Sequence, residues 1–172
     1  EGTRNLIAAA RAAGARRLVA ESVAFFYAPE GDWVKDEQAP LDLDAPGKAA
    51  AAVAAIADME QQVLEADGLE GLALRFGWFY GPGTYAAPGG SQADEVRRRR
   101  YPIVGEGNAT FSFIHTEDAA AAVLAALEGG APGVYNVVDD EPSPLREWLP
   151  VYAEAMGAKP PDAGVTGAEV PV

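Results

Sequence analysis

Residues 16 to 79 constrain the fold most strongly, because they have the pattern of a strand, a helix and a second strand in that order. The first strand is "RRLVAES" (16–22), the helix is "AAAAVAAIADMEQQVLEADG" (49–68) and the second strand is "LALRFGWF" (72–79). Two strands joined through a helix are expected to lie parallel, with a right-handed crossover. The sequence therefore predicts an α/β fold built on half of a doubly wound parallel sheet.

Helical spacing of apolar residues supports two of the expected helices. A helix over 3–13 places four of them on one face before Gly14, namely Leu6, Ile7, Ala10 and Ala13. The helix over 49–68 ends at Gly68 and is expected to bury a stripe of Val53, Ile56, Val63 and Leu64. The proline-rich and acidic segment between the first strand and this helix predicts a long surface loop.

The remainder of the chain predicts shorter elements. They are a helix in "SQADEVRRRR" (91–100), two strands around a glycine turn in "YPIVGEGNATFSFI" (101–114), a helix capped by Thr116, a strand "GVYNVV" (133–138) and a last helix after Pro144. These elements divide the chain into a βαβ unit over 1–84, an intertwined smaller subdomain over 85–157 and a tail over 158–172.

Composition excludes several classes of partner. The 26 acidic residues outnumber the 13 basic ones, for a net charge of −13, which repels nucleic acid and anionic membrane surfaces. No apolar run approaches the roughly 20 residues that cross a bilayer. The chain has no cysteine, which excludes disulfides and thiolate zinc sites and fits a reducing compartment such as the cytoplasm.

Four stretches, in order, resemble one family. They are "GTRNLIAAARAAGARRLVAESVAFFYAP", "LRFGWFYGPG", "FSFIHTEDAAAAVLAALE" and "GVYNVVDDEPSPLREW", and together they span roughly residues 2–157. They resemble the extended short-chain dehydrogenase/reductase superfamily, in its NAD-dependent epimerase/dehydratase branch. The resemblance implies a partial Rossmann-like doubly wound sheet with a small C-terminal α/β substrate-type subdomain, and NAD(P) as the ancestral cofactor.

The sequence departs from that family in two places. No Gly-x-x-Gly-x-x-Gly turn occurs in the 172 residues, so we expect the nucleotide-binding half and the family's final residues to be missing. The family's catalytic Tyr and Lys correspond to Ala52 and Ile56, counted back from Glu60, and neither can titrate. Members that have lost this dyad are called atypical, and "ESVAFFYAP" and "FSFIHTED" resemble that subset. We therefore expect that this chain does not bind NAD(P) in the family's manner.

The resemblance also nominates residues beside the nicotinamide. The strand and loop "LRFGWFYGPG" are similar to the family's nicotinamide-side loop, which implies cofactor contacts for Arg75, Gly77, Trp78 and Tyr80.

The candidate catalytic residues are His115, Ser22, Tyr27 and Asp118. His115 is the only histidine and could act as a general base, or it could simply pack and cap the helix that follows. Ser22 and Tyr27 follow the end of the first strand, where α/β sites collect. A Ser–His–Asp arrangement is conceivable, but no Gly-x-Ser-x-Gly elbow exposes Ser22.

An oxygen-rich divalent metal site is a weaker alternative, formed by His115, Asp139 and Asp140.

Three functions remain open from the sequence. The first is a truncated oxidoreductase relative, the second a cofactor-free or metal-assisted hydrolase of esters or phosphoesters, and the third a non-catalytic remnant that self-associates. In each case a small-molecule substrate, if any, is unknown. Strands that normally lie inside a larger sheet would expose an edge, so we predict a homodimer or higher oligomer.

Overall fold

The structure is a computed structural model that describes residues 1–31 and 33–161. The chain forms two compact units. The sheet unit comprises residues 1–77 and 118–138, and the small unit comprises residues 78–117 and 139–161. The predicted tail over 158–172 lies, from residue 162 onward, outside the described residues.

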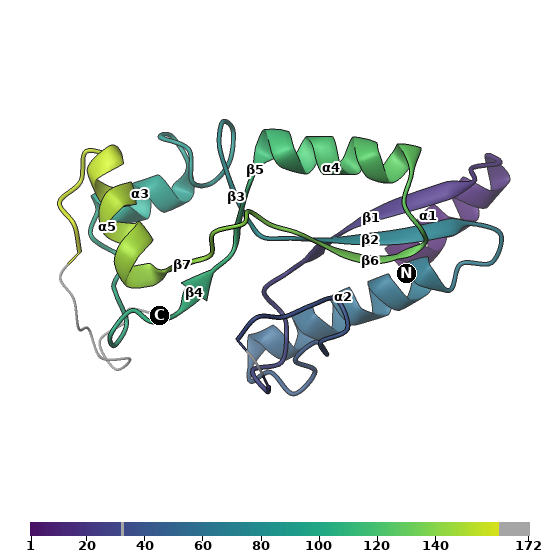
Figure 1. Cartoon of the computed structure of the whole chain (residues 1–172), viewed down its shortest axis with the longest axis horizontal. Helices are drawn as coiled ribbons and strands as arrows, with labels where there is room; N and C mark the ends of the chain where they lie inside the picture. The colour runs from purple at the N-terminus through teal and green to yellow at the C-terminus, as the bar shows by residue number, and fades with distance from the viewer. Residues whose placement is uncertain (32, 162–172) are drawn as a thin grey trace. The chain divides into compact units, whose positions relative to one another are not determined.

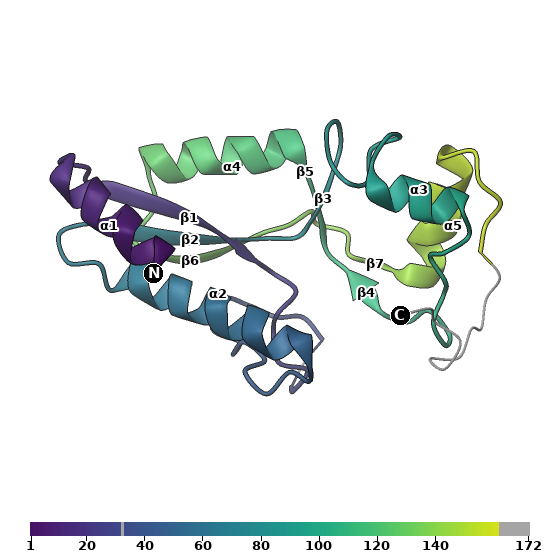
Figure 2. The same ribbon diagram turned by 180° about the vertical axis from the view of Figure 1, so that it is seen from behind.

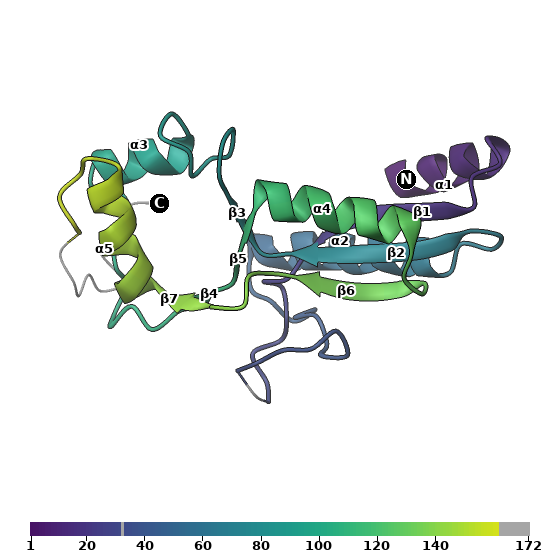
Figure 3. The same ribbon diagram turned by 45° about the horizontal axis from the view of Figure 1, so that its top comes forward.

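The sheet unit contains the predicted parallel sheet. Its strands are β1 (Arg17–Val23), β2 (Glu70–Phe76) and β6 (Gly133–Val137), in the order β1-β2-β6. Both pairings are parallel, and Figure 3 shows β2 between its two neighbours. The α/β class is thereby confirmed. The central strand is buried from Gly71 to Phe76, whereas most of β1 is only half-buried, as expected for an edge strand.

Three helices accompany this sheet. They are α1 (Gly2–Ala12), α2 (Lys48–Leu64) and α4 (Thr116–Glu128), and Figures 1 and 2 show α2 and α4 on opposite faces. The predicted stripe on α2 needs a correction. Val53 and Val63 are buried as expected, but Glu60 is buried with them and Leu64 remains 37% exposed. The Glu60 carboxylate can be buried on this face because it forms an ion pair with Arg75 of β2, as described below.

Gly71 lets α2 pack closely on β2. A Cβ atom at this position would lie 2.0 Å from the carbonyl oxygen of Val63, in the last turn of α2. Because that contact is to backbone, a side chain would force the helix away from the strand. The crossover of α2 on the sheet thus depends on a glycine.

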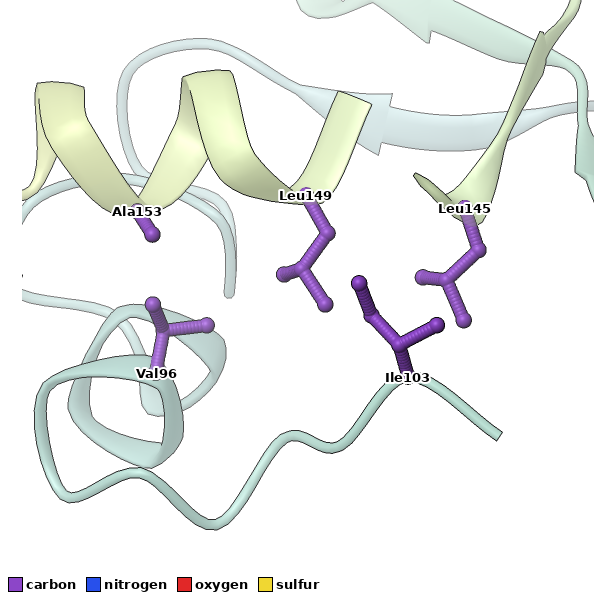
Figure 4. Close-up of a cluster of buried hydrophobic side chains, with 5 residues drawn as sticks. All are labelled: Val96, Ile103, Leu145, Leu149 and Ala153. Atoms are coloured by element: carbon purple, nitrogen blue, oxygen red, sulfur yellow. The ribbon is translucent and has the colours of Figure 1, made fainter. Parts of the chain in front are cut away.

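The small unit has two short strand pairs and two helices. Strand β3 (Trp78–Tyr80) is parallel to β5 (Phe113–His115), and β4 (Thr110–Phe111) is antiparallel to β7 (Ser143–Pro144). Helices α3 (Ser91–Arg97) and α5 (Leu145–Ala155) pack together around an aliphatic core (Figure 4). That core consists of Val96, Ile103, Leu145, Leu149 and Ala153.

Two sequence-based boundaries differ from the structure. The expected strand over 72–79 is interrupted at Gly77, where the chain leaves the sheet and β3 pairs with β5 instead. The two strands expected around a glycine turn in 101–114 both follow that turn, as β4 and β5. In each case the partner strand is distant in sequence, so local periodicity could not identify it.

Residues 24–31 and 33–47 form a long loop, as predicted, with one isolated bridge between Tyr27 and Leu41. Among the described residues, no helix combines the length and apolar character that a membrane crossing requires.

Candidate functional site

A row of polar side chains crosses the sheet one residue before each strand ends. Ser22 on β1 is in register with Arg75 on β2, which is in register with Asn136 on β6. The carboxyl ends of parallel strands are where α/β proteins place their ligand sites. This row is therefore the candidate site of the sheet unit.

Arg75 and Glu60 form a buried ion pair at the centre of the row. Arg75 Nε donates to Glu60 Oε1 at 2.8 Å, and Nη2 donates to Oε2 at 2.7 Å. Each side chain is 6% exposed. The hydroxyl of Ser22 donates to the same Oε1 atom. Two parallel bonds give this pair the two-pronged geometry that suits arginine and a carboxylate.

The electrostatics of the pair follow from this geometry. Burial alone would raise the pKa of Glu60, but hydrogen bonds from Arg75 and Ser22 and the charge of Arg75 outweigh it, so the pKa lies below its ordinary value. Burial would likewise lower the pKa of Arg75, but Glu60 and Tyr27 raise it above its ordinary value. Both groups are charged at neutral pH.

Tyr27 connects the pair to β6. Its hydroxyl accepts a bond from Arg75 Nη1 at 2.9 Å and donates to Asn136 Oδ1 at 2.6 Å. The Arg75 guanidinium carbon also lies 4.9 Å from the Tyr27 ring centroid. Asn136 in turn donates from its backbone to Glu37 Oε1 and from Nδ2 to the Lys35 carbonyl oxygen. The network thus holds the loop over 24–47 against the edge strand.

The structure places three of the predicted site residues in this network. Ser22 is 1% exposed and its proton is directed to Glu60, so it is not an exposed nucleophile. Arg75, expected beside the cofactor, is 5% exposed with its nitrogens bonded inside the protein. Tyr27, a catalytic candidate, takes part in the network instead. Gly77 is buried, and its N–H donates to the Val137 carbonyl oxygen.

The positions of the family's Tyr and Lys lie on α2. Ala52, two turns before Glu60, is exposed, and Ile56, one turn before it, is half-buried. Neither side chain can donate a proton or hold a ribose hydroxyl. The 172 residues also contain no Gly-x-x-Gly-x-x-Gly turn, so neither of these two family features for holding the cofactor occurs in them.

His115 caps and packs in the small unit. Its Nδ1 accepts the backbone N–H of Glu117 at 3.3 Å, in the first turn of α4, so the neutral ring carries its proton on Nε2. Thr116, expected to cap this helix, is its first residue, and the side-chain cap that the structure gives comes from His115. The ring centroid lies 5.1 Å from that of Tyr80, and a Cβ at Gly81 would lie 2.6 Å from Nε2. The packing and capping interpretation of His115 is the one that these contacts support.

The acidic candidates do not gather around a metal position. Asp118 and Asp140 are exposed, and Asp139 is half-buried with its N–H bonded to the Phe113 carbonyl oxygen. Within residues 1–31 and 33–161, no group of three or more His, Asp or Glu side chains could hold a metal ion.

Aromatic rings line one side of the β3–β5 pair. Trp78 is in register with Phe113, and Tyr80 with His115. The centroid of Trp78 lies 5.8 Å from that of Phe111, and the Tyr80 centroid lies 6.3 Å from that of Phe113. Of the four residues expected beside the nicotinamide, Trp78 and Tyr80 are the two whose side chains reach the surface.

Two residues of this network, Glu60 on α2 and Asn136 in the polar row, escaped prediction as site residues. Glu60 was recognised only as a landmark on α2, although an arginine inside an apolar strand requires an acid on the helix that covers it. Asn136 was missed because its role depends on the register of β6 with β2, which local sequence does not reveal.

Two proteins of similar sequence are named as reductases. The 3-diazoavenalumate denitrifying reductase of a Streptomyces species is 51% identical over 162 residues, which are 94% of this chain and 53% of that protein. The 2-alkyl-3-oxoalkanoate reductase of Stenotrophomonas maltophilia is 32% identical over 96% of this chain and 52% of its own length. The chain spans about half the length of the curated relatives it matches.

Two solved structures of similar fold contain bound NAD. The UDP-glucose 4-epimerase of Thermus thermophilus, solved with NAD, has a TM-score of 0.69 and 27% identity, over 99% of this chain and 58% of that one. The dTDP-glucose 4,6-dehydratase DesIV of Streptomyces venezuelae, with NAD and TYD bound, has a TM-score of 0.74 and 22% identity, over 96% and 52% of the two chains.

A sequence model described as the NAD dependent epimerase/dehydratase family matches residues 1–137, well over half of the chain. The parallel sheet and the order of the motifs agree with that match. The chain therefore belongs to the NAD dependent epimerase/dehydratase family.

Proposed function

We propose that these 172 residues are the substrate-side part of a reductase of this family, and that alone they do not bind NAD(P) in the family's manner. The reaction we assign is reduction of an electrophile that takes up hydride without needing the family's proton donor. The observation that carries this proposal is the pair Ala52 and Ile56 at the positions of the Tyr and Lys.

The chemistry of two substrate classes explains why this pair matters. Reduction of a carbonyl leaves an oxyanion, which must receive a proton, and the family's Tyr supplies it. A diazonium carbon reacts differently. Hydride adds to the carbon, the C–N bond breaks, and its electron pair leaves with N₂, so that no proton is needed. A reduced nicotinamide held mainly by residues outside these 172 would be the two-electron donor.

Similarity to a relative supports the same substrate class. The 51% identical relative is named a reductase that denitrifies a diazo compound. The hydrolase alternative has no observation in its favour, because Ser22 is buried and the described residues form no metal cluster.

Two measurements test the proposal. Titration of the 172-residue chain with NADPH, followed by nicotinamide fluorescence, should show no binding in the micromolar range. A fusion that places the N-terminal residues of the diazo reductase before Glu1 should bind NADPH. It should transfer deuterium from [4-²H]NADPH to the arene formed from an aryl diazonium salt, above a protein-free control.

Two results would contradict the proposal. Micromolar NADPH binding by the chain alone would show that the missing turn is not required. A fusion that reduces benzaldehyde faster than the diazonium salt would show that the substitutions at Ala52 and Ile56 do not restrict the substrate class.

A further inference from the structure

One face of the small unit is formed by aromatic side chains. Residues two apart on a strand share a face, so Trp78 and Tyr80 lie on one side of β3, with Phe113 and His115 beside them on β5. Phe111 lies two residues before Phe113, and their rings stack with centroids 6.1 Å apart and planes at 17°. We call these five residues the aromatic face.

The aromatic face borders the core of the small unit, against which Phe111 packs. The five core residues in Figure 4 are aliphatic and at most 6% exposed. None of the five residues of the aromatic face is buried, and Tyr80 is 40% exposed. Rings that contact one another yet remain open to solvent are typical of surfaces that bind apolar, planar ligands.

Trp148 supplies an independent indication of a ligand. Its ring contacts the aromatic face, with centroids 5.3 Å from Phe111 and 5.4 Å from Phe113. Its Nε1–H is buried and has no acceptor among the residues that the structure describes. Buried tryptophan N–H groups usually have a hydrogen-bond partner, and an unsatisfied one is destabilising. An acceptor atom on a bound molecule would satisfy it.

We propose that the aromatic face binds a planar aromatic or conjugated ring of the substrate, with an acceptor atom of that substrate bonded to Trp148 Nε1. This assignment rests on the proposed function, whose substrate class it narrows. The negative faces of the rings also favour a positively charged ring substituent such as a diazonium group. None of these six side chains carries a positive charge that could pair with a nucleotide diphosphate.

Three probes test the assignment on the 172-residue chain without NADPH. They are cinnamamide, its ring-saturated analogue 3-cyclohexylpropanamide, and UDP, compared by saturation-transfer NMR and competition. We expect cinnamamide to bind about fivefold more tightly than the saturated analogue, as ring–ring contacts predict. UDP should not displace it.

Variants then locate the bound ring. Phe113→Leu should weaken cinnamamide binding about fivefold, since it removes one ring but keeps apolar volume. Trp148→Phe, which keeps a ring and removes the N–H donor, should also weaken it. Val151→Ala, at a residue of α5 that is 69% exposed, is the matched control and should not change binding. Thermal unfolding checks that each variant is folded.

The possible failures are distinct. Equal binding of the two amides, displacement by UDP, or no binding of cinnamamide would overturn the assignment whatever the variants do. Because these measurements omit NADPH, they do not depend on hydride transfer. Failure here, together with diazonium reduction by the fusion, would remove the role of the aromatic face and leave the proposed function intact.

Discussion

The guanidinium group of Arg17, the first residue of β1, donates a hydrogen bond to the carbonyl oxygen of Gly129, just beyond the end of α4. The same group donates to Ala126 O at 2.6 Å and Gly130 O at 3.0 Å, and it pairs with Glu70 on β2. The last carbonyl groups of a helix lack partners within it and carry partial negative charge. Arg17 therefore satisfies the end of α4 and joins that helix to the sheet.

Replacing Arg17 should loosen the end of α4. We expect Arg17→Met to lower the free energy of unfolding by roughly 1–3 kcal/mol, because several charge-assisted bonds are lost at a half-buried site. Hydrogen exchange should show faster exchange in the last turn of α4. Arg16→Met, at the exposed neighbouring residue, is the control. Equal effects of the two changes would contradict the capping role.

Removing one partner of the buried Arg75–Glu60 pair should lower the free energy of unfolding strongly. Glu60→Gln leaves the Arg75 charge without its partner, so we expect a loss of about 3–5 kcal/mol in urea unfolding. Glu65→Gln, at an exposed residue just beyond the same helix, should change stability by less than about 0.5 kcal/mol. Adding Arg75→Met to Glu60→Gln should recover part of the loss. If the double variant is as unstable as the sum of the single variants, the two residues are not coupled.

The pair also predicts a pH dependence of stability. The pKa of Glu60 is lower in the folded chain than the value of about 4.3 expected when unfolded. The unfolded state therefore takes up the proton first as pH falls, which favours unfolding. The contribution of Glu60 should be complete above about pH 5 and lost as pH falls through its folded pKa. Urea midpoints between pH 3 and 7 should show this decline in the parent chain and a smaller one in Glu60→Gln.

Restoring the family's dyad should broaden the substrate range. In the fusion described above, Ala52→Tyr with Ile56→Lys should allow carbonyl reduction, because a phenol and an ammonium group then stand at the family's spacing. NADPH consumption with benzaldehyde measures the gain. Ala51→Tyr with Ala55→Lys has the same spacing on an exposed part of α2 and should give none. Equal gains from both pairs would argue against a positional role.

Self-association remains a prediction, supported by the edge position of β1 and by exposed apolar side chains on two helices. Leu6 on α1 is 66% exposed, and Leu124 on α4 is 61% exposed. We expect an oligomer by light scattering across the micromolar range. Leu6→Glu and Leu124→Glu should distinguish which helix contributes, since a charge at the interface would shift the chain toward monomer. A parent chain that is monomeric throughout that range would refute the prediction.

Local patterns predicted much of the fold and less of the site. Apolar patterns predicted β1, α2, β6 and α5 to within a few residues, and the capping position of Thr116 predicted α4. The departure of β3 from the sheet depends on pairing with β5, about 35 residues later, and no local signal marks it. The resemblance predicts a cofactor contact for Arg75. Its burial instead depends on the ion pair with Glu60, which lies on a separate helix.

The polar row also reports the alignment of the strands. Asn136 lies between Tyr135 and Val137, so sliding β6 by one residue along β2 would place one of those side chains opposite Arg75. The Tyr27 hydroxyl would then lose its acceptor, the amide oxygen of Asn136, because neither Tyr135 nor Val137 has such an oxygen. Every side chain of β6 would also move to the opposite face of the sheet. Correct alignment of the three strands is thus coupled to one set of hydrogen bonds. A sheet with β6 out of register would lose these bonds and be less stable than the native sheet.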